Sequence, residues 1–131
     1  PEADDAALQQ ALSLVGLGPW LATLPDALGT VVGERGRAMS TGERQRLALA
    51  RAILADPRVL VLDEATGALD QATEAAVLAS LDAWLAARTV VLITHRPAVA
   101  AMASRTIVLQ RGRVVSDAPT PGAAAVPSPP A

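Results

Sequence analysis

The sequence contains no lysine and no cysteine, and each absence excludes a kind of site. Its 11 basic residues are all arginines. Because the lysine ammonium is missing, no phosphate-binding loop of the GxxxxGK(S/T) kind can form within this chain. Because cysteine is missing, the chain has neither disulfides nor thiolate metal sites, and its cysteine usage does not indicate a redox compartment.

Aromatic residues are scarce as well, at 2% of a chain of 131 residues that is 51% hydrophobic. A hydrophobic core must therefore be built from Leu, Val, Ile and Ala side chains. The length suits one ordinary domain or a piece of a larger one. The chain begins with Pro1 and shows no signal-peptide pattern, so we expect a fragment of a longer protein.

The charge and the apolar runs also exclude two kinds of partner. The formal net charge is −2, which gives no electrostatic reason to bind nucleic acid. No apolar run approaches the roughly 20 residues that a membrane-spanning helix needs. We therefore expect no nucleic-acid partner and no membrane span within these residues.

Helical and extended patterns alternate along the chain. Helical patterns cover about residues 5–16, 19–21, 41–54, 71–87 and 97–104, and residues 25–37 are typical of a loop. The runs VLVLD (59–63) and TVVLIT (89–94) are continuous and apolar, which predicts strands buried on both faces. A hairpin is predicted around Gly112, and the Pro-rich segment from Asp117 onward predicts a disordered tail. The alternation predicts an α/β fold with a parallel sheet and right-handed crossovers.

Polar side chains follow both predicted strands of the sheet. Asp63 and Glu64 end the first strand, and His95 follows the second. Carboxyl ends of parallel strands meet at one edge, where open α/β sheets bind ligands. One carboxylate could hold Mg²⁺ and the other could orient an attacking water, while the imidazole could donate a hydrogen bond to a terminal phosphate. A solvated strand end explains the carboxylates equally well, and a lone histidine is more often a structural or surface residue.

The stretch AMSTGERQRLALARAIL places a polar group of residues directly before a helix. Ser40 and Glu43 match the S-x-x-E capping box, which explains both residues without a ligand. Gly42 is not explained by the cap, because glycine in a helix costs about 0.5–1 kcal/mol relative to alanine. A phosphate that approaches the free N–H groups of the helix start would explain it. The two interpretations are compatible.

Together these residues resemble the ATP-binding cassette (ABC) family, in the second half of its nucleotide-binding domain. The segments MSTGERQRLALARAIL, VLVLDEATGALD and LITHR resemble the signature motif with its helix, the Walker B strand with the D-loop, and the switch-histidine loop. TVVGERG resembles the TEVGERG segment that exporter-type members place near the transmembrane coupling helices. The resemblance covers the chain up to the Pro-rich tail. It implies a partial P-loop NTPase fold with flanking helices and part of the α-helical subdomain.

The resemblance also implies a role for each matching residue. Glu64 would polarise the attacking water, and His95 would contact the γ-phosphate. Asp63 would help to bind Mg²⁺ through its water shell, and Asp70 would communicate across a dimer. The remaining positions would contact an ATP molecule held by the partner protomer: Ser40, Thr41, Gly42 and Glu43.

By the same resemblance, residues 1–54 would be part of the helical subdomain with the signature helix. Residues 55–116 would be the C-terminal part of the RecA-like ATPase core, and residues 117–131 the disordered tail. The implied partners are a second nucleotide-binding domain, identical or different, and transmembrane domains at the cytoplasmic face of a bacterial plasma (inner) membrane. The chain alone is expected to be inactive, because the phosphate loop is missing from it.

Two alternatives remain open at the level of the sequence. A non-transport ABC ATPase would share the cassette, although it would have no use for a coupling segment such as TVVGERG. A degenerate half-site that completes a partner's ATP site without hydrolysis is favoured by Thr41, which stands where the family has its first signature glycine. The intact Glu64 and His95 favour hydrolysis instead.

Overall fold

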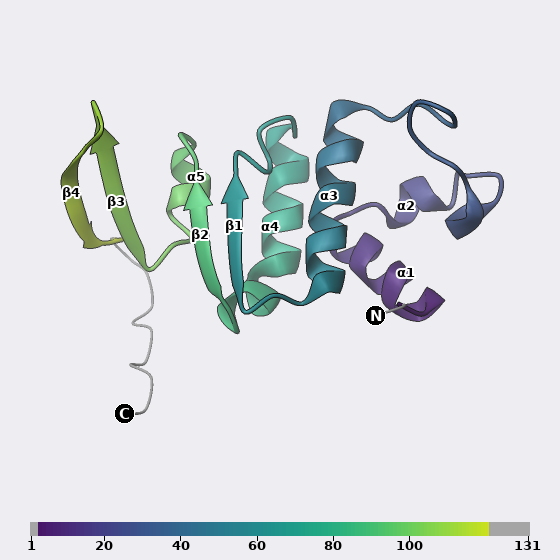
Figure 1. The fold of residues 1–131 in the computed structure, drawn as a ribbon, viewed down its shortest axis with the longest axis horizontal. Helices are drawn as coiled ribbons and strands as arrows, with labels where there is room; N and C mark the ends of the chain where they lie inside the picture. Colours follow the sequence, from purple (N-terminus) through teal and green to yellow (C-terminus); the bar gives the residue numbers. More distant parts are fainter. Residues whose placement is uncertain (1–2, 121–131) are drawn as a thin grey trace. The chain divides into compact units, whose positions relative to one another are not determined.

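The computed structural model describes residues 3–120 and has the mixed helix and strand content that the sequence predicts (Figure 1). It divides into two compact units, Pro1–Val91 and Leu92–Ala131. The elements in chain order are α1 (Asp5–Leu14), α2 (Gly18–Leu21), the 3-10 helix η1 (Ala27–Gly29), α3 (Thr41–Ala55), β1 (Val59–Asp63), α4 (Gln71–Ala86), β2 (Thr89–Ile93), α5 (Pro97–Ala100), β3 (Arg105–Gln110) and β4 (Arg113–Pro119). Among the described residues, no helix has both the length and the apolar composition that a membrane crossing requires.

The helix ends follow local signals in the sequence. The Asp4 carboxylate caps α1 by accepting a hydrogen bond of 2.8 Å from the Ala7 N–H. Gly16, just beyond this helix, has a φ of +70°, a conformation that glycine adopts without strain. Helix α3 ends at Ala55, and its C-cap Asp56, directly before Pro57, has a φ of +46°. The predicted positions of these helices are therefore confirmed to within a few residues.

One aliphatic core holds the first unit together. Helices α1, α3 and α4 contribute to this core, so the compact units do not divide at residue 54. The functional boundary between the helical subdomain and the ATPase core at that residue stays a prediction. The largest fully buried side chains of the aliphatic core are Leu17, Leu81, Val15 and Val77. The core is free of Phe and Tyr, as the composition requires, and Trp20 and Trp84 pack at its edge.

Strands β1 and β2 form a two-stranded parallel sheet beside α4 (Figure 1). The prediction that both faces of these strands are buried is wrong for this chain. Exposure alternates along β1, with Leu60 buried and Val59 and Val61 exposed by 61% and 58%. In β2, Val91 and Ile93 are exposed by 46% and 49%. A continuous apolar run fits a strand covered on both faces, but here the alternation leaves one face open.

The second unit contains the predicted hairpin, in which β3 pairs with β4 in antiparallel register. Arg111 and Gly112 both have positive φ at its turn, as a tight two-residue connection requires. The predicted start of the disordered tail at Asp117 is too early, because β4 runs to Pro119 and Asp117 forms an ion pair of 2.6 Å with Arg105. Residues 121–131 lie outside the described residues. Helix α5 is shorter than predicted and ends at Ala100.

The loop that contains TVVGERG is a closed turn. The Arg37 N–H donates to the Val31 carbonyl at 2.9 Å, and the Gly36 N–H donates to the Gly33 carbonyl at 3.1 Å. A Cβ atom at Gly36 would lie 2.0 Å from the Val31 carbonyl oxygen, which is too close for any side chain. The turn leaves Val31 exposed by 66%.

We therefore expect Gly36→Ala to destabilise the fold by roughly 1–3 kcal/mol, the range typical of a disrupted backbone contact. Urea unfolding of the purified protein measures the change. Gly29→Ala is the matched control, because a Cβ there would make an ordinary contact of 3.8 Å with Asp26. Equal free energies of unfolding for the two variants would show that the turn is not closed as described.

Candidate functional site

The chain reverses sharply where β1 ends. Asp63 is the last residue of the strand and is exposed, while Glu64 is half-buried and has a φ of +47°. A left-handed conformation in a residue other than glycine costs about 1–3 kcal/mol and persists only where the surroundings fix it. The Gly67 N–H closes the turn by donating to the Glu64 carbonyl at 3.0 Å. A Cβ at Gly67 would lie only 3.2 Å from that carbonyl oxygen, so the absence of a side chain suits this tight turn.

The segment after this turn is attached to helices on both sides. The Thr66 hydroxyl donates a hydrogen bond of 2.6 Å to the Glu74 carboxylate of α4, and both residues are buried. The Ala68 N–H donates a hydrogen bond of 2.9 Å to the side-chain oxygen of Gln45 on α3. Leu69 enters the core. The segment from Glu64 to Asp70 is therefore held between α3 and α4.

Sequence reasoning missed Gln45 and Glu74, although each carries a detectable signal. Gln45 precedes the buried Leu49 by four residues, and Glu74 precedes the buried Val77 by three. Residues at these spacings share one face of a helix. A polar side chain on the apolar face of a helix needs a buried hydrogen-bond partner, and that pattern could have indicated both residues.

The start of α3 carries the predicted capping box. The Glu43 N–H donates to the Ser40 hydroxyl at 3.1 Å, and the Ser40 N–H donates to the Glu43 carboxylate at 2.7 Å. This second hydrogen bond holds the pKa of Glu43 below its usual value. The carboxylate therefore stays ionised near neutral pH, and its stabilising contribution is lost as the pH falls through that lowered pKa.

The neighbouring Thr41 and Gly42 have structural surroundings that the sequence did not indicate. The Arg44 guanidinium donates to the Thr41 hydroxyl at 2.9 Å. A Cβ at Gly42 would lie 3.2 Å from a methyl carbon of Leu69 and 3.4 Å from the Ala68 carbonyl oxygen. The chain itself thus makes the close backbone approach that glycine permits here. A phosphate is no longer needed to explain Gly42, although the structure leaves the predicted contact untested.

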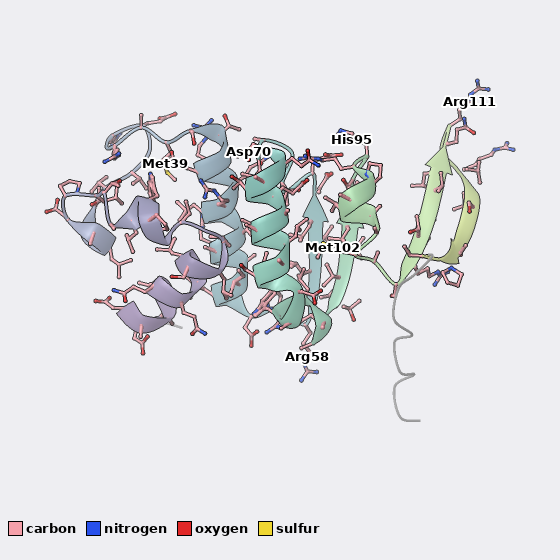
Figure 2. All side chains as sticks on the ribbon, turned by 180° about the vertical axis from the view of Figure 1, so that it is seen from behind. Met39, Arg58, Asp70, His95, Met102 and Arg111 are labelled. Carbon is pink, nitrogen blue, oxygen red and sulfur yellow. The ribbon has the colours of Figure 1, made fainter. Side chains whose placement is uncertain are left out.

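Asp70 begins α4 as its N-cap. Its carboxylate accepts hydrogen bonds from the Thr73 hydroxyl at 2.6 Å and from the Thr73 N–H at 3.0 Å. The hydroxyl in particular holds the pKa of Asp70 below its usual value. Figure 2 shows Asp70 and Met39 at the same end of the α3 and α4 pair. This end carries the start of α3, the Glu64 turn and the start of α4.

His95 follows β2 and is exposed. It belongs to the second unit, whereas the two predicted carboxylates belong to the first. Next to it, the Arg96 N–H donates to the Thr94 hydroxyl at 3.0 Å. The expectation that His95 meets Asp63 at one sheet edge stays a prediction.

The residues present fit a metal ion that is bound mainly by other groups. Among residues 3–120, no group of three or more His, Asp or Glu side chains gathers as a metal site. Mg²⁺ in phosphate-binding sites commonly uses one or two carboxylates together with waters and substrate phosphates. The single exposed carboxylate of Asp63 suits that arrangement and would not suffice for a site made of protein ligands alone.

Known proteins match this chain in sequence and in fold. The family model described as ABC transporter matches residues 3–67. The chain is 49% identical to the ABC-type transporter atr1 of Mycosarcoma maydis, over 86% of this chain and 8% of that protein. It is 46% identical to the mycobactin import ATP-binding/permease protein IrtB of Mycobacterium bovis, over 89% of this chain and 20% of that protein.

Among solved structures, a bacterial Atm1-family ABC exporter with ATP bound superimposes with a TM-score of 0.81 at 36% identity. That match covers 90% of this chain and 21% of the exporter. The chain therefore spans about a fifth or less of the length of these relatives. With agreement in motif order, sequence and fold, the chain belongs to the ABC transporter family and represents part of an exporter-type ATP-binding cassette.

Proposed function

We propose that this chain acts within a full-length exporter-type ABC transporter, where it takes part in ATP hydrolysis at the interface of two nucleotide-binding domains. The observation that carries the proposal is the convergence at one end of the first unit. There the Ser40-capped helix start, the Glu64 turn and the Asp70 cap lie on adjoining elements. Support also comes from the similarity to a solved bacterial ABC exporter that has ATP bound.

Each residue would act through its position. The Glu64 carboxylate would accept a proton from the water that attacks the γ-phosphate, and the His95 imidazole would hydrogen-bond to that phosphate. Asp63 would help to hold Mg²⁺, which, when bound, neutralises charge on the phosphates. Asp70 would transmit the state of one site to the other.

The start of α3 would contact a second ATP molecule, the one held by the partner domain. Free N–H groups at the beginning of a helix and the positive end of its dipole favour a phosphate. Ser40, Thr41, Gly42 and Glu43 would present this end to an ATP molecule held by the partner domain. The guanidinium of Arg44, which contacts Thr41, adds positive charge close by. Each site would then be completed by two protomers.

The proposed partners are a second nucleotide-binding domain and transmembrane domains, at the cytoplasmic face of a membrane. The exposed turn at Val31 would lie next to the transmembrane part. The relatives include fungal and bacterial proteins, and one is named for import, so exporter-type sequence alone does not set the direction of transport. A half-site that only completes the partner's ATP site is the second candidate, and the side chain at Thr41 favours it.

We expect Glu64→Gln in the full-length protein to lower ATP turnover by about 100-fold or more, the loss typical of a missing general base. ATP binding should remain, because glutamine keeps the size of the side chain. Steady-state hydrolysis and equilibrium nucleotide binding measure the two effects. Asp82→Asn, on an exposed part of α4, is the control for loss of one negative charge. Unchanged turnover in Glu64→Gln would exclude the proposed base and favour the half-site.

Ser40→Ala separates a helix cap from a nucleotide contact. Loss of the cap should cost about 0.5–2 kcal/mol of stability, whereas loss of a phosphate contact should lower turnover by about tenfold even where the protein is fully folded. Thermal unfolding and hydrolysis at a low temperature measure these quantities. Ser80→Ala is the matched control, since its exposed hydroxyl donates a hydrogen bond within α4 to the Ala76 carbonyl. A stability loss with unchanged turnover would mean that Ser40 is only a cap.

The chain of 131 residues alone should not bind ATP tightly, because it has no lysine and hence no phosphate loop. Calorimetric titration of the purified chain with ATP and Mg²⁺ measures this directly. The full-length protein is the positive control. Tight, Mg²⁺-dependent binding by the chain alone would contradict the proposed division of the site between segments and protomers.

A further inference from the structure

Gln45 connects the signature helix to the turn that carries Glu64. Its side-chain oxygen accepts the 2.9 Å hydrogen bond from the Ala68 N–H, and its side-chain nitrogen lies 3.5 Å from the Glu64 carbonyl oxygen. The first contact has the ordinary length of a hydrogen bond, and the second is long and therefore weak. The reverse orientation of the amide would place donor against donor and acceptor against acceptor, so these two partners define which way the side chain points.

The turn needs such support because its backbone is strained. Glu64 has a left-handed φ, and Gly67 offers no side chain that could pack against the turn. Conformations of this kind persist where neighbouring groups over-determine them. The contact from Gln45 reaches both ends of the turn, at the Glu64 carbonyl and at the Ala68 amide.

A second contact joins the same two segments one helical turn earlier. Gly42 packs against Ala68 and Leu69, where even a methyl group would come within 3.2 Å of a neighbour. Gly42 and Gln45 are three residues apart, so they lie on one face of α3. The first turns of this helix and the Glu64 turn are therefore in direct contact at two points within one protomer.

We propose that Gln45 is a positioning residue that fixes the Glu64 turn on the start of the signature helix. The inference rests on the proposed function. It means that two parts of one protomer shift together. They are the start of α3, which faces the ATP held by the partner, and the Glu64 carboxylate, which faces the other ATP. A change at the phosphate of the ATP held by the partner would thereby reach Glu64 of the protomer whose helix contacts that phosphate. The connection would run through the Gln45 side chain and the Gly42 contact.

The test replaces Gln45 in the full-length protein. Gln45→Met keeps the side-chain length but removes both polar contacts, and we expect turnover to fall by about 10-fold to 100-fold, as misplacement of a catalytic group commonly does. The ATP dissociation constant should change by less than about threefold, since the turn does not hold the phosphates in the ground state. Gln10→Met, at an exposed position of α1, is the matched control and should leave turnover unchanged.

Gln45→Glu supplies the conservative rescue. It keeps an acceptor oxygen for the Ala68 N–H and should therefore retain more turnover than Gln45→Met, which a purely steric role would not predict. In the Glu64→Gln background, Gln45→Met should cause no further loss, because the residue acts through Glu64.

Three outcomes would overturn the proposal: turnover of Gln45→Met equal to that of the Gln10→Met control, no rescue by Gln45→Glu, or a further loss in the Glu64→Gln background. Full activity of Glu64→Gln itself would instead contradict the proposed function. The two failures are therefore distinguishable. If Gln45→Met fails to fold, Gln45→Glu is compared with the wild type and with Gln10→Met. Turnover of Gln45→Glu as low as that of a Glu64 variant, with an undiminished affinity for ATP, would then overturn the assigned role of the Ala68 contact.

Discussion

The contact between the start of α3 and the Glu64–Asp70 segment is the constraint on which the rest of the site depends. It brings the N-terminus of α3 against a segment more than twenty residues further along the chain, which carries the strained strand end and the cap of α4. Thr66 and Glu74 attach the same segment to α4 through a buried hydrogen bond. Helices α3 and α4 also share the aliphatic core. Close apolar packing in that core therefore holds the two helices, and with them the polar end of the unit, in place.

Much of this organisation could be predicted from the sequence because the signals are local. The capping box at Ser40 and Glu43 needs only residues three apart, and the helix end at Asp56 follows from the next residue being proline. The turn of the hairpin follows from Gly112, which takes up a positive φ. The family resemblance rests on motif order, which is also a property of the sequence alone.

Features that depend on tertiary contacts could not be predicted in the same way. From the sequence alone, Gly42 indicates a close approach by a ligand. In the structure Leu69, which is far along the chain, lies beside it instead. The exposure of Val59 and Val61 depends on which layers cover β1, and a continuous apolar run carries no information about that. The side-chain role of Gln45 depends on a backbone N–H more than twenty residues away, at Ala68.

The central claim is that the Ala68 N–H is held by Gln45, and amide hydrogen exchange at Ala68 tests it most directly. Measured by NMR at residue resolution, exchange should be slow in the wild-type protein although Ala68 is exposed and lies in a turn. The protection should disappear in Gln45→Met while the α4 amides remain protected. Fast exchange in the wild type, or equal protection in both proteins, would contradict the account.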